Sequence, residues 1–358
     1  MQIEKGFIKI LFVGVACSLA LSCEVSCSKA QDSQEQTKAR PMILDMDLGS
    51  STDDLVCMDL MLKSHLDGEI NLLGIICDRM GDSNAIVADI FRTYYGLPDI
   101  PIGLERDGVE NPQVFVNYSP FLDTLGLSSG HRVFERQVSD CSLLPDAYKL
   151  YRKLLSGADD RSVTIISTGF LTSISNLLTS PSDEFSDLSG DLLVARKVKE
   201  LIIMAGQFSD TREPDYNMKQ ASRWAENFVR LWPADVPVTY NPMEVGEDLD
   251  YTKEQVLEDL SAFDVHPLKQ IYTDTQLSEG QRMWDPVCFL YAVEDKSLFN
   301  VSSPGFVVID VSDFTMDFHP DESFNQYYLR PFTEGNAEKV LSIIREGCSR
   351  EPGRRARE

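Results

Sequence analysis

The sequence of 358 residues has few histidines and few basic side chains for its length. Four His and 33 Lys and Arg stand against 57 Asp and Glu, which gives a formal net charge of −24. A surface this acidic repels phosphate backbones and anionic headgroups, so the composition argues against binding to nucleic acid or to a membrane surface. It suits a neutral or cationic small molecule or a divalent cation, although solubility alone would also account for it.

No CxxC pair occurs, although the chain contains eight cysteines. Without paired spacing, neither a zinc site nor a disulfide framework is indicated. Three of the cysteines fall in the N-terminal 30 residues. The others are scattered and mostly lie in or beside apolar runs, so we expect buried thiols, while a disulfide stays open. These five are Cys57, Cys77, Cys141, Cys288 and Cys348.

A long apolar run is also missing. The stretch from Ile10 to Leu21, which follows Lys5 and Lys9, is too short to span a bilayer as a permanent helix and is typical of a secretory signal. Cys23 follows Ala-Leu-Ser, an arrangement similar to a relaxed bacterial lipobox, so Cys23 is a candidate lipid anchor. We therefore predict a signal peptide and flexible tether over residues 1–40, in an exported bacterial protein that is periplasmic or anchored to the outer membrane. A cleaved signal that releases a soluble protein is the alternative.

Short apolar runs alternate with amphipathic stretches over the rest of the chain. This βαβ alternation predicts an α/β fold with a mostly parallel central sheet and helices on both faces, a Rossmann-like open sandwich. We expect one domain over residues 41–348 and a disordered tail over 349–358. Residues 248–281 look helical and acidic. The predicted strands are 41–48, 70–77, 100–104, 163–167, 201–205, 236–240 and 305–311, and the predicted helices are 55–66, 85–95, 145–155, 171–178, 221–231 and 337–346.

The sharpest feature is an aspartate cluster where the first strand meets the first helix. Asp45, Asp47, Asp53 and Asp54 fall within ten residues. Carboxylates ~4 Å apart repel each other by a few kcal/mol at an intermediate dielectric, so a cation or a shared proton must offset the repulsion. Oxygen ligands at a turn suit calcium better than zinc. An acidic helix start, with Thr52 as its N-cap, would account for the last two aspartates but not for the first two, which end a buried strand.

Five motifs in order resemble the inosine–uridine preferring nucleoside hydrolase family. The first is the strand with its Asp-x-Asp-x-Gly loop and Asp-Asp pair, beginning at Asp45. The motifs reach from about residue 41 to 295. The other four are Ser167–Ile174 (STGFLTSI), Leu201–Gly206 (LIIMAG), Asp215–Asn217 (DYN) and Asp285-Pro286.

The resemblance implies a calcium-dependent hydrolysis of the N-glycosidic bond of ribonucleosides. Asp47 would bind calcium and act as general base toward a metal-bound water. Asp54, the backbone carbonyl of Thr168 and Asp285 would complete the protein ligands, with Asp45 supporting them from behind. Carboxylates also stabilise the positive charge that develops on the ribose. No covalent nucleophile is needed, so the lack of a Ser-His-Asp or Cys-His pattern is no objection. The family often forms oligomers, which makes a homo-oligomer an expectation by analogy.

The resemblance also implies the substrate contacts, with four departures from the family pattern. Asp53 would bind the ribose hydroxyls, but two extra residues separate it from Gly49. Asp82 stands where the family has Asn, and Asp215, which would hold the sugar together with Asn217, replaces a Glu. Trp284 replaces a His, so no leaving-group acid can be named. Trp284 either stacks on the base or simply packs in the core.

Two other classes of protein remain open from the sequence. Asp45 and Asp47 also resemble the phosphatase motif in which the first Asp is phosphorylated, although Gly49 and the early Asp-Asp pair fit it poorly. A non-catalytic extracytoplasmic protein that binds ribosides or sugars on the same fold is the second, supported by Trp284 and Asp82.

Overall fold

The computed structural model describes residues 39–49, 51–110, 118–209, 211, 213–273, 279–333 and 335–352. The predicted signal peptide and most of the tether, including Cys23, lie outside these residues. Within the described part no helix is both long and apolar enough to cross a membrane. The five cysteines of that part are all buried free thiols, as predicted.

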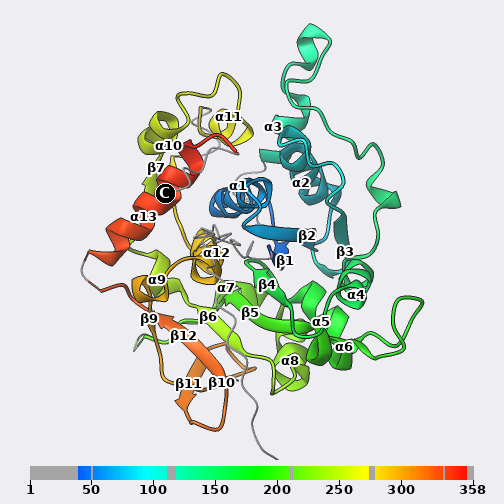
Figure 1. Cartoon of the computed structure of the whole chain (residues 1–358), viewed down its shortest axis with the longest axis vertical. Helices are drawn as coiled ribbons and strands as arrows, with labels where there is room; N and C mark the ends of the chain where they lie inside the picture. The colour runs from blue at the N-terminus through cyan, green and yellow to red at the C-terminus, as the bar shows by residue number, and fades with distance from the viewer. Residues whose placement is uncertain are drawn as a thin grey trace, which may run out of the picture. The chain divides into compact units, whose positions relative to one another are not determined.

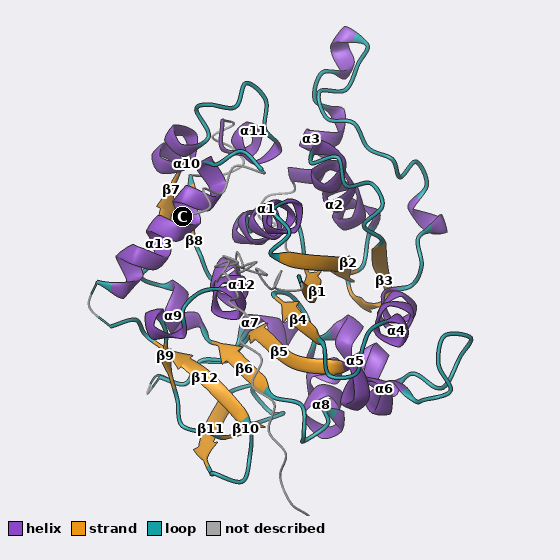
Figure 2. Cartoon of the chain, in the orientation of Figure 1, coloured by secondary structure: helices purple, strands orange, loops and turns teal. Residues whose placement is uncertain are grey.

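A large sheet forms the centre of the domain (Figures 1 and 2). Its body is parallel, and an antiparallel extension continues from β12. The parallel strands, in spatial order, are β3 (Ile102–Val109), β2 (Ile70–Arg79), β1 (Arg40–Met46), β4 (Val163–Ser167), β5 (Val198–Met204), β6 (Val238–Asn241) and β12 (Gln326–Arg330). The extension consists of β9 (Asn300–Val301), β10 (Gly305–Ile309) and β11 (Met316–Pro320).

The central strands are mostly apolar, as expected where both faces of a sheet are covered. Along β1, Met42 and Leu44 pack into the core on one face, while Ile43 between them packs into the core on the other. The first face carries α1 (Asp53–Leu66), α2 (Asp82–Tyr94), α12 (Asp285–Val293) and α13 (Asn336–Ser349); the second carries α4 (Ala147–Gly157), α5 (Thr172–Thr179), α6 (Gly190–Lys197) and α8 (Ser222–Leu231). This arrangement confirms the predicted fold class.

Shorter elements connect these layers. They are α3 (Tyr118–Thr124), α7 (Tyr216–Gln220), α9 (Met243–Gly246), α10 (Lys253–Asp259), α11 (Pro267–Thr273), a two-stranded ribbon of β7 (Asp250–Thr252) and β8 (Gly280–Arg282), and 3-10 turns at Leu127–Ser129, Cys141–Leu143 and Lys296–Leu298.

The prediction of a helical segment over residues 248–281 is wrong in part. The ribbon β7–β8 brackets two short helices, because Tyr251 is buried between exposed neighbours in the alternation of a strand. Thr252 then starts α10 with a capping box to Gln255. The predicted tail also begins too early, since Ser349 ends α13 and Arg350 forms an ion pair with Asp67. Residues 353–358 lie outside the described part.

The strand order places a topological switch point between β1 and β4. The chain runs outward from β1 through β2 to β3, and then returns to build β4, β5 and β6 on the other side. In an open parallel sheet a crevice forms beyond the carboxyl ends of the two strands where the order reverses. Asp45 at the end of β1 lies in register with Ser167 at the end of β4. The aspartate cluster and the Thr168 motif therefore meet at this crevice.

Candidate active site

The ends of β1 and β4 are tied together by backbone. The N–H of Thr168 donates a hydrogen bond of 2.8 Å to the carbonyl oxygen of Asp45. The Asp45 side chain points away into the protein, where the phenol of Tyr151 donates a hydrogen bond of 2.5 Å to it. Asp45 is fully buried and does not line the cavity described below, so it lies behind the other aspartates.

Helix α1 begins directly over the strand ends with two buried aspartates. Asp53 and Asp54 occupy its first turn, where the helix dipole favours negative charge. Thr52 is the N-cap residue, but its hydroxyl does not cap the helix. It forms a hydrogen bond of 2.6 Å with the phenol of Tyr272 instead. The predicted N-cap position is therefore confirmed, although the Thr52 side chain forms no capping hydrogen bond.

Helix α12 brings the third carboxylate. It begins with Asp285 and Pro286, and proline is favoured at this position because it needs no amide hydrogen-bond partner there. Helices α1 and α12 pack side by side, as Figure 1 shows. One oxygen each of Asp53, Asp54 and Asp285 lies within 4.8 Å of the others. Within the described residues, these three form the group that can hold a metal ion.

The electrostatics of this group are those of crowded, buried acids. Burial raises the pKa of Asp53 to about 6, and it also raises the pKa of Asp54 and Asp285 well above the usual value, with repulsion between the carboxylates adding to the effect. The pKa of Asp47 is raised by burial too, although the nearby Arg79 guanidinium opposes the shift. Crowded acids of this kind hold protons unless a cation replaces them.

A cavity of about 400 Å³ opens onto the three clustered carboxylates, and Asp47 and Thr168 line it as well. Residues of β5, α7, α9 and the residue before α12 also line the cavity. The remaining lining residues are Ser51, Met204, Asp215, Tyr216, Asn217, Met243 and Trp284.

The Asp215–Asn217 segment is held rigidly in the cavity wall. Asp215 is the N-cap of α7, and its two carboxylate oxygens accept hydrogen bonds of 2.8 Å from the N–H groups of Met218 and Gly206. Burial raises the pKa of Asp215 to about 6 even though these bonds favour its charged form. The amide of Asn217 donates to the carbonyl oxygen of Thr168 at 3.3 Å, which links this wall to the end of β4.

Trp284 is held in the cavity wall by a hydrogen bond of its indole. Its indole N–H donates a hydrogen bond of 2.7 Å to the carbonyl oxygen of Met243. Behind the ring stands Gly246, where a Cβ atom would lie only 2.2 Å from the indole Cδ1. The missing side chain at position 246 therefore makes room for the ring. Trp284 therefore both packs against α9 and forms part of the cavity wall.

One predicted contact residue is not at the cavity. Asp82 is exposed at the first residue of α2 and is not among the lining residues. The preceding strand runs two residues further than its apolar pattern indicated, so Asp78 and Arg79 are the charged residues that it carries to the site. Both are buried. The sequence offered a signal for them, because two charges follow directly after six apolar or small residues of β2.

Arg79 supports the loop between Asp47 and Asp53 from below. It donates hydrogen bonds to the carbonyl oxygen of Leu48 and, at 2.7 Å, to the side chain of Asn84. Gly49 has φ of +135°, and a Cβ atom there would overlap the Arg79 guanidinium. Only glycine fits this close approach. Ser50, one of the extra loop residues, lies outside the described part.

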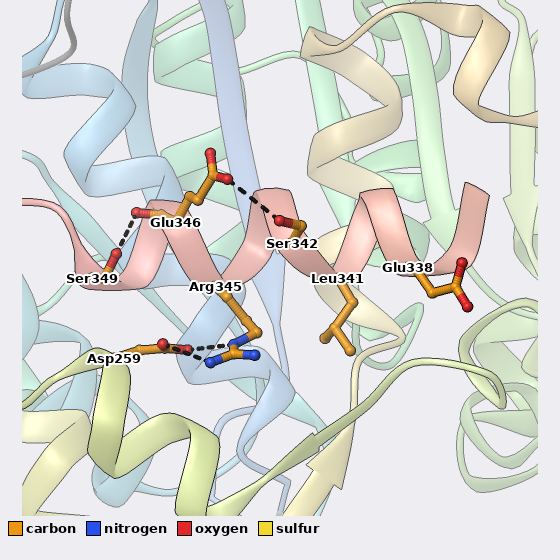
Figure 3. Close-up of a pocket in the computed structure, with 7 residues that line it drawn as sticks. All are labelled: Asp259, Glu338, Leu341, Ser342, Arg345, Glu346 and Ser349. Carbon is orange, nitrogen blue, oxygen red and sulfur yellow. Dashed lines mark hydrogen bonds and ion pairs between the residues drawn. The ribbon is translucent and has the colours of Figure 1, made fainter. Parts of the chain in front are cut away.

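A second hollow, of about 380 Å³, lies on the surface of α13 and differs in chemistry (Figure 3). In this hollow Arg345 binds Asp259 with bonds of 2.8 and 2.9 Å, and Ser342 donates to Glu346 at 3.3 Å. Its main ion pair is already formed, and among the described residues the group of carboxylates that can hold a metal ion lies at the other cavity. The cavity at the switch point is therefore the candidate active site.

Solved structures with the same fold include three nucleoside hydrolases. A plant nucleoside hydrolase, PpNRh1, is 16% identical, with a TM-score of 0.63, and the match covers 87% of this chain and 99% of that one. The inosine-uridine preferring nucleoside hydrolase of Bacillus anthracis is 16% identical, with a TM-score of 0.62 and coverage of 86% and 99%. The purine-preferring ribonucleoside hydrolase of Gardnerella vaginalis is 15% identical, with a TM-score of 0.61 and coverage of 87% and 99%.

The chain belongs to the inosine-uridine preferring nucleoside hydrolase family, whose sequence model matches residues 42–330. This confirms the resemblance drawn from the five motifs and favours it over the phosphatase interpretation of Asp45 and Asp47. No curated protein sequence matches the chain. The family establishes the general class of reaction, nucleoside hydrolysis.

Proposed function

We propose that this chain hydrolyses the N-glycosidic bond of ribonucleosides with calcium as its cofactor, releasing free base and ribose. The observation that carries the proposal is the convergence of Asp53, Asp54 and Asp285 within 4.8 Å at a cavity large enough for a nucleoside. The family membership of the chain supports the reaction class.

The side chains present suit calcium. All the candidate ligands are hard oxygen donors: the carboxylates of Asp54 and Asp285, the carbonyl of Thr168 and, by the motif, Asp47. Burial, together with repulsion between the carboxylates, raises the pKa of Asp54 and Asp285, and a bound divalent cation would favour their charged forms. Asp53 belongs to the same group by distance, and it would share the ion or turn toward the ribose. Bound calcium would orient the attacking water and lower its pKa.

The residues of the cavity would carry out proton transfer, charge stabilisation and substrate binding. Asp47 lines the cavity beside the cluster and would take the proton of the attacking water. The clustered carboxylates would stabilise the positive charge that develops on the ribose ring. Asp215 and Asn217, fixed by backbone hydrogen bonds, would hold the sugar in one orientation. Trp284 and Tyr216 would flank the base.

The test measures release of reducing sugar from a panel of purine and pyrimidine ribonucleosides. We expect activity that a chelator removes and calcium restores, and we expect Asp47→Ala to abolish it. Asp82→Ala is the matched control, because Asp82 is exposed and outside the cavity, and it should keep wild-type activity. Binding of a nucleoside without release of base or ribose would overturn the proposal in favour of a binding protein.

We also propose that the chain is exported and anchored through Cys23. Labelled fatty acid should be incorporated into the wild-type chain and not into Cys23→Ser. Equal labelling of the two would overturn the anchor.

A further inference from the structure

The loop between Asp47 and Asp53 belongs to neither of the elements that it joins. Strand β1 ends at Met46 and helix α1 begins at Asp53. The backbone groups between them therefore lack the regular hydrogen bonds of a sheet or a helix. Buried backbone groups without partners cost free energy, so side chains from other elements have to hold such a loop in one conformation.

The phenol of Tyr118 bridges two residues of this loop. Its oxygen accepts a hydrogen bond of 2.6 Å from the N–H of Gly49, and its O–H donates one of 3.0 Å to the carbonyl oxygen of Ser51. Burial raises the pKa of Tyr118 well above the usual value, and the charge of Asp54 adds to the shift, so the phenol keeps the proton that it donates. A hydroxyl accepts and donates through one atom, which a phenylalanine ring cannot do.

Packing fixes the position of this phenol. Tyr118 is the first residue of α3, and its side chain is fully buried in the core that α1 and α2 also share. Helix α3 in turn packs against α2 and α11. Because the ring is already ordered by its neighbours, its two hydrogen bonds to the loop cost little further conformational entropy. The loop is thus held against a rigid support.

Ser51 connects this support to the cavity. Both Ser51 and Asp53 line the cavity, whereas Tyr118 is not among the lining residues. The Ser51 hydroxyl donates a hydrogen bond to the carboxylate of Asp53. Tyr118 therefore holds Ser51 by its backbone, and Ser51 holds Asp53 by its side chain.

We propose that Tyr118 is a positioning residue for Asp53 and acts through Ser51. This inference rests on the proposed function, since Asp53 is one of the three carboxylates at the proposed metal site. Without the phenolic hydroxyl, the Gly49 N–H and the Ser51 carbonyl lose a buried partner, and the loop shifts to recover hydrogen bonds elsewhere. The Ser51 hydroxyl then moves relative to Asp53. A displacement of about 1 Å in an active site can lower a rate by about a hundredfold.

Tyr118→Phe is the first test, because it removes the hydroxyl and keeps the ring. With the calcium-loaded full chain and inosine and uridine as substrates, we expect kcat/KM to fall by roughly ten- to a hundredfold. Tyr251→Phe is the matched control. Tyr251 is also fully buried and donates a hydrogen bond of 2.9 Å to Asp259, but it lies outside the cavity, so its variant should keep the wild-type kcat/KM. An unchanged kcat/KM in Tyr118→Phe would overturn the inference.

A double-mutant cycle tests whether Tyr118 acts through Ser51. Ser51→Ala removes the hydroxyl that binds Asp53 but keeps the carbonyl that binds Tyr118. If the two residues act in series, kcat/KM of the double variant should lie within about twofold of that of Ser51→Ala alone. A general structural effect of Tyr118 would instead multiply the two losses, and that result would also overturn the inference.

Calcium binding provides a measurement that does not depend on nucleoside hydrolysis. In titration calorimetry we expect Tyr118→Phe and Ser51→Ala each to raise the dissociation constant for calcium by roughly two- to tenfold, the range of one hydrogen bond. Tyr251→Phe should leave the dissociation constant unchanged.

The outcomes separate this inference from the proposed function. A wild-type chain that binds calcium but releases no sugar would overturn the proposed function, while weaker binding in the two variants would still support the positioning of Asp53. An active wild type whose calcium affinity is the same in Tyr118→Phe would overturn the inference alone. A wild type that neither binds calcium nor releases sugar would overturn both.

Discussion

The guanidinium of Arg79 donates a hydrogen bond to the backbone carbonyl of Leu48, one residue after Asp47. A buried cation thus holds the loop that carries the candidate base, and its charge opposes the rise in the pKa of both Asp47 and Asp54. The proposed calcium ion would act on the same carboxylates.

Removal of Arg79 should therefore lower the free energy of unfolding most in the metal-free protein. Arg79→Met leaves the carboxylates without their buried cation, and we expect it to lower the free energy of unfolding by roughly 3 kcal/mol in chelator. Added calcium should recover part of this loss. Chemical denaturation with and without calcium measures both values. Arg92→Met, which breaks the pair with Asp89 away from the cavity, should cost the same in both conditions. An Arg79→Met loss that is unaffected by calcium would contradict this account.

Calcium should stabilise the folded chain through the clustered carboxylates. At a concentration 100 times its dissociation constant, an ion that binds only the native state contributes about 2.7 kcal/mol. For a domain of this size we expect an increase in Tm of roughly 4 °C. Asp285→Asn should abolish the increase, because it removes one member of the group. Asp248→Asn, an exposed carboxylate elsewhere, should keep it. A full increase in Asp285→Asn would show that the ion binds at another place.

The stability of the metal-free protein should fall as the pH rises from about 4 toward 7. Burial raises the folded-state pKa of Asp53 and Asp215 to about 6 and of Asp45 to about 7, while the unfolded chain releases the same protons near pH 4. In this window the folded state binds more protons than the unfolded state, so raising the pH favours unfolding. The contribution of Asp53 alone is ~3 kcal/mol. Thermal denaturation in chelator from pH 4.5 to 7.5 tests the direction.

Calcium should reverse that trend. Because the ion and the protons compete for the same oxygens, its stabilising effect should be small near pH 5 and large near pH 7.5. A calcium effect that is independent of pH would contradict the assignment of these carboxyls to the metal site.

Lys63 is expected to be a structural residue with no part in the reaction. It is fully buried, pairs with Asp59 at 2.8 Å, and donates to the carbonyl oxygen of Cys348 at 2.6 Å near the end of α13. Burial alone would raise the pKa of Asp59, but Lys63 and His266 hold it below the usual value. Lys63→Met should destabilise the fold by about 3–5 kcal/mol because Asp59 is left charged and buried.

The double variant Lys63→Met with Asp59→Asn provides the control. It should recover much of the lost stability, since neither charge is then unpaired. At temperatures where both variants are folded, kcat should match the wild type. A loss of kcat in folded Lys63→Met would show that this pair influences the active site.

Most of the fold was predictable from the sequence because the strands are short and mostly apolar. The strand 163–167 has the predicted ends, and β1 ends two residues before its predicted end. The ribbon β7–β8 was missed because its strands are three residues long and pair across 27 residues of sequence, which local periodicity does not reveal. The additional length of β2 depends on its pairing with β3, where Arg79 is opposite Val109 after an irregular step.

The site residues that follow an apolar strand directly were predictable from the sequence. Those whose position depends on where a turn begins, or on how two helices pack, were not. Asp47, Asp54, Thr168 and Asp285 were placed at one cavity by their motifs, and they all line it. Asp82 was misplaced because sequence order alone does not say where the turn after β2 begins. The nearness of Asp53 to Asp285 depends on the packing of α1 against α12, a long-range contact.

The place of Trp284 in the cavity wall depends on Gly246, a residue that does not line the cavity. Even one methyl group at that position would lie 2.2 Å from the indole and force the ring to move. Descendants of this sequence could thus change which heterocycle they admit without altering any residue in contact with it. Comparisons of specificity among related chains should therefore include the residue at position 246 as well as the residue at position 284.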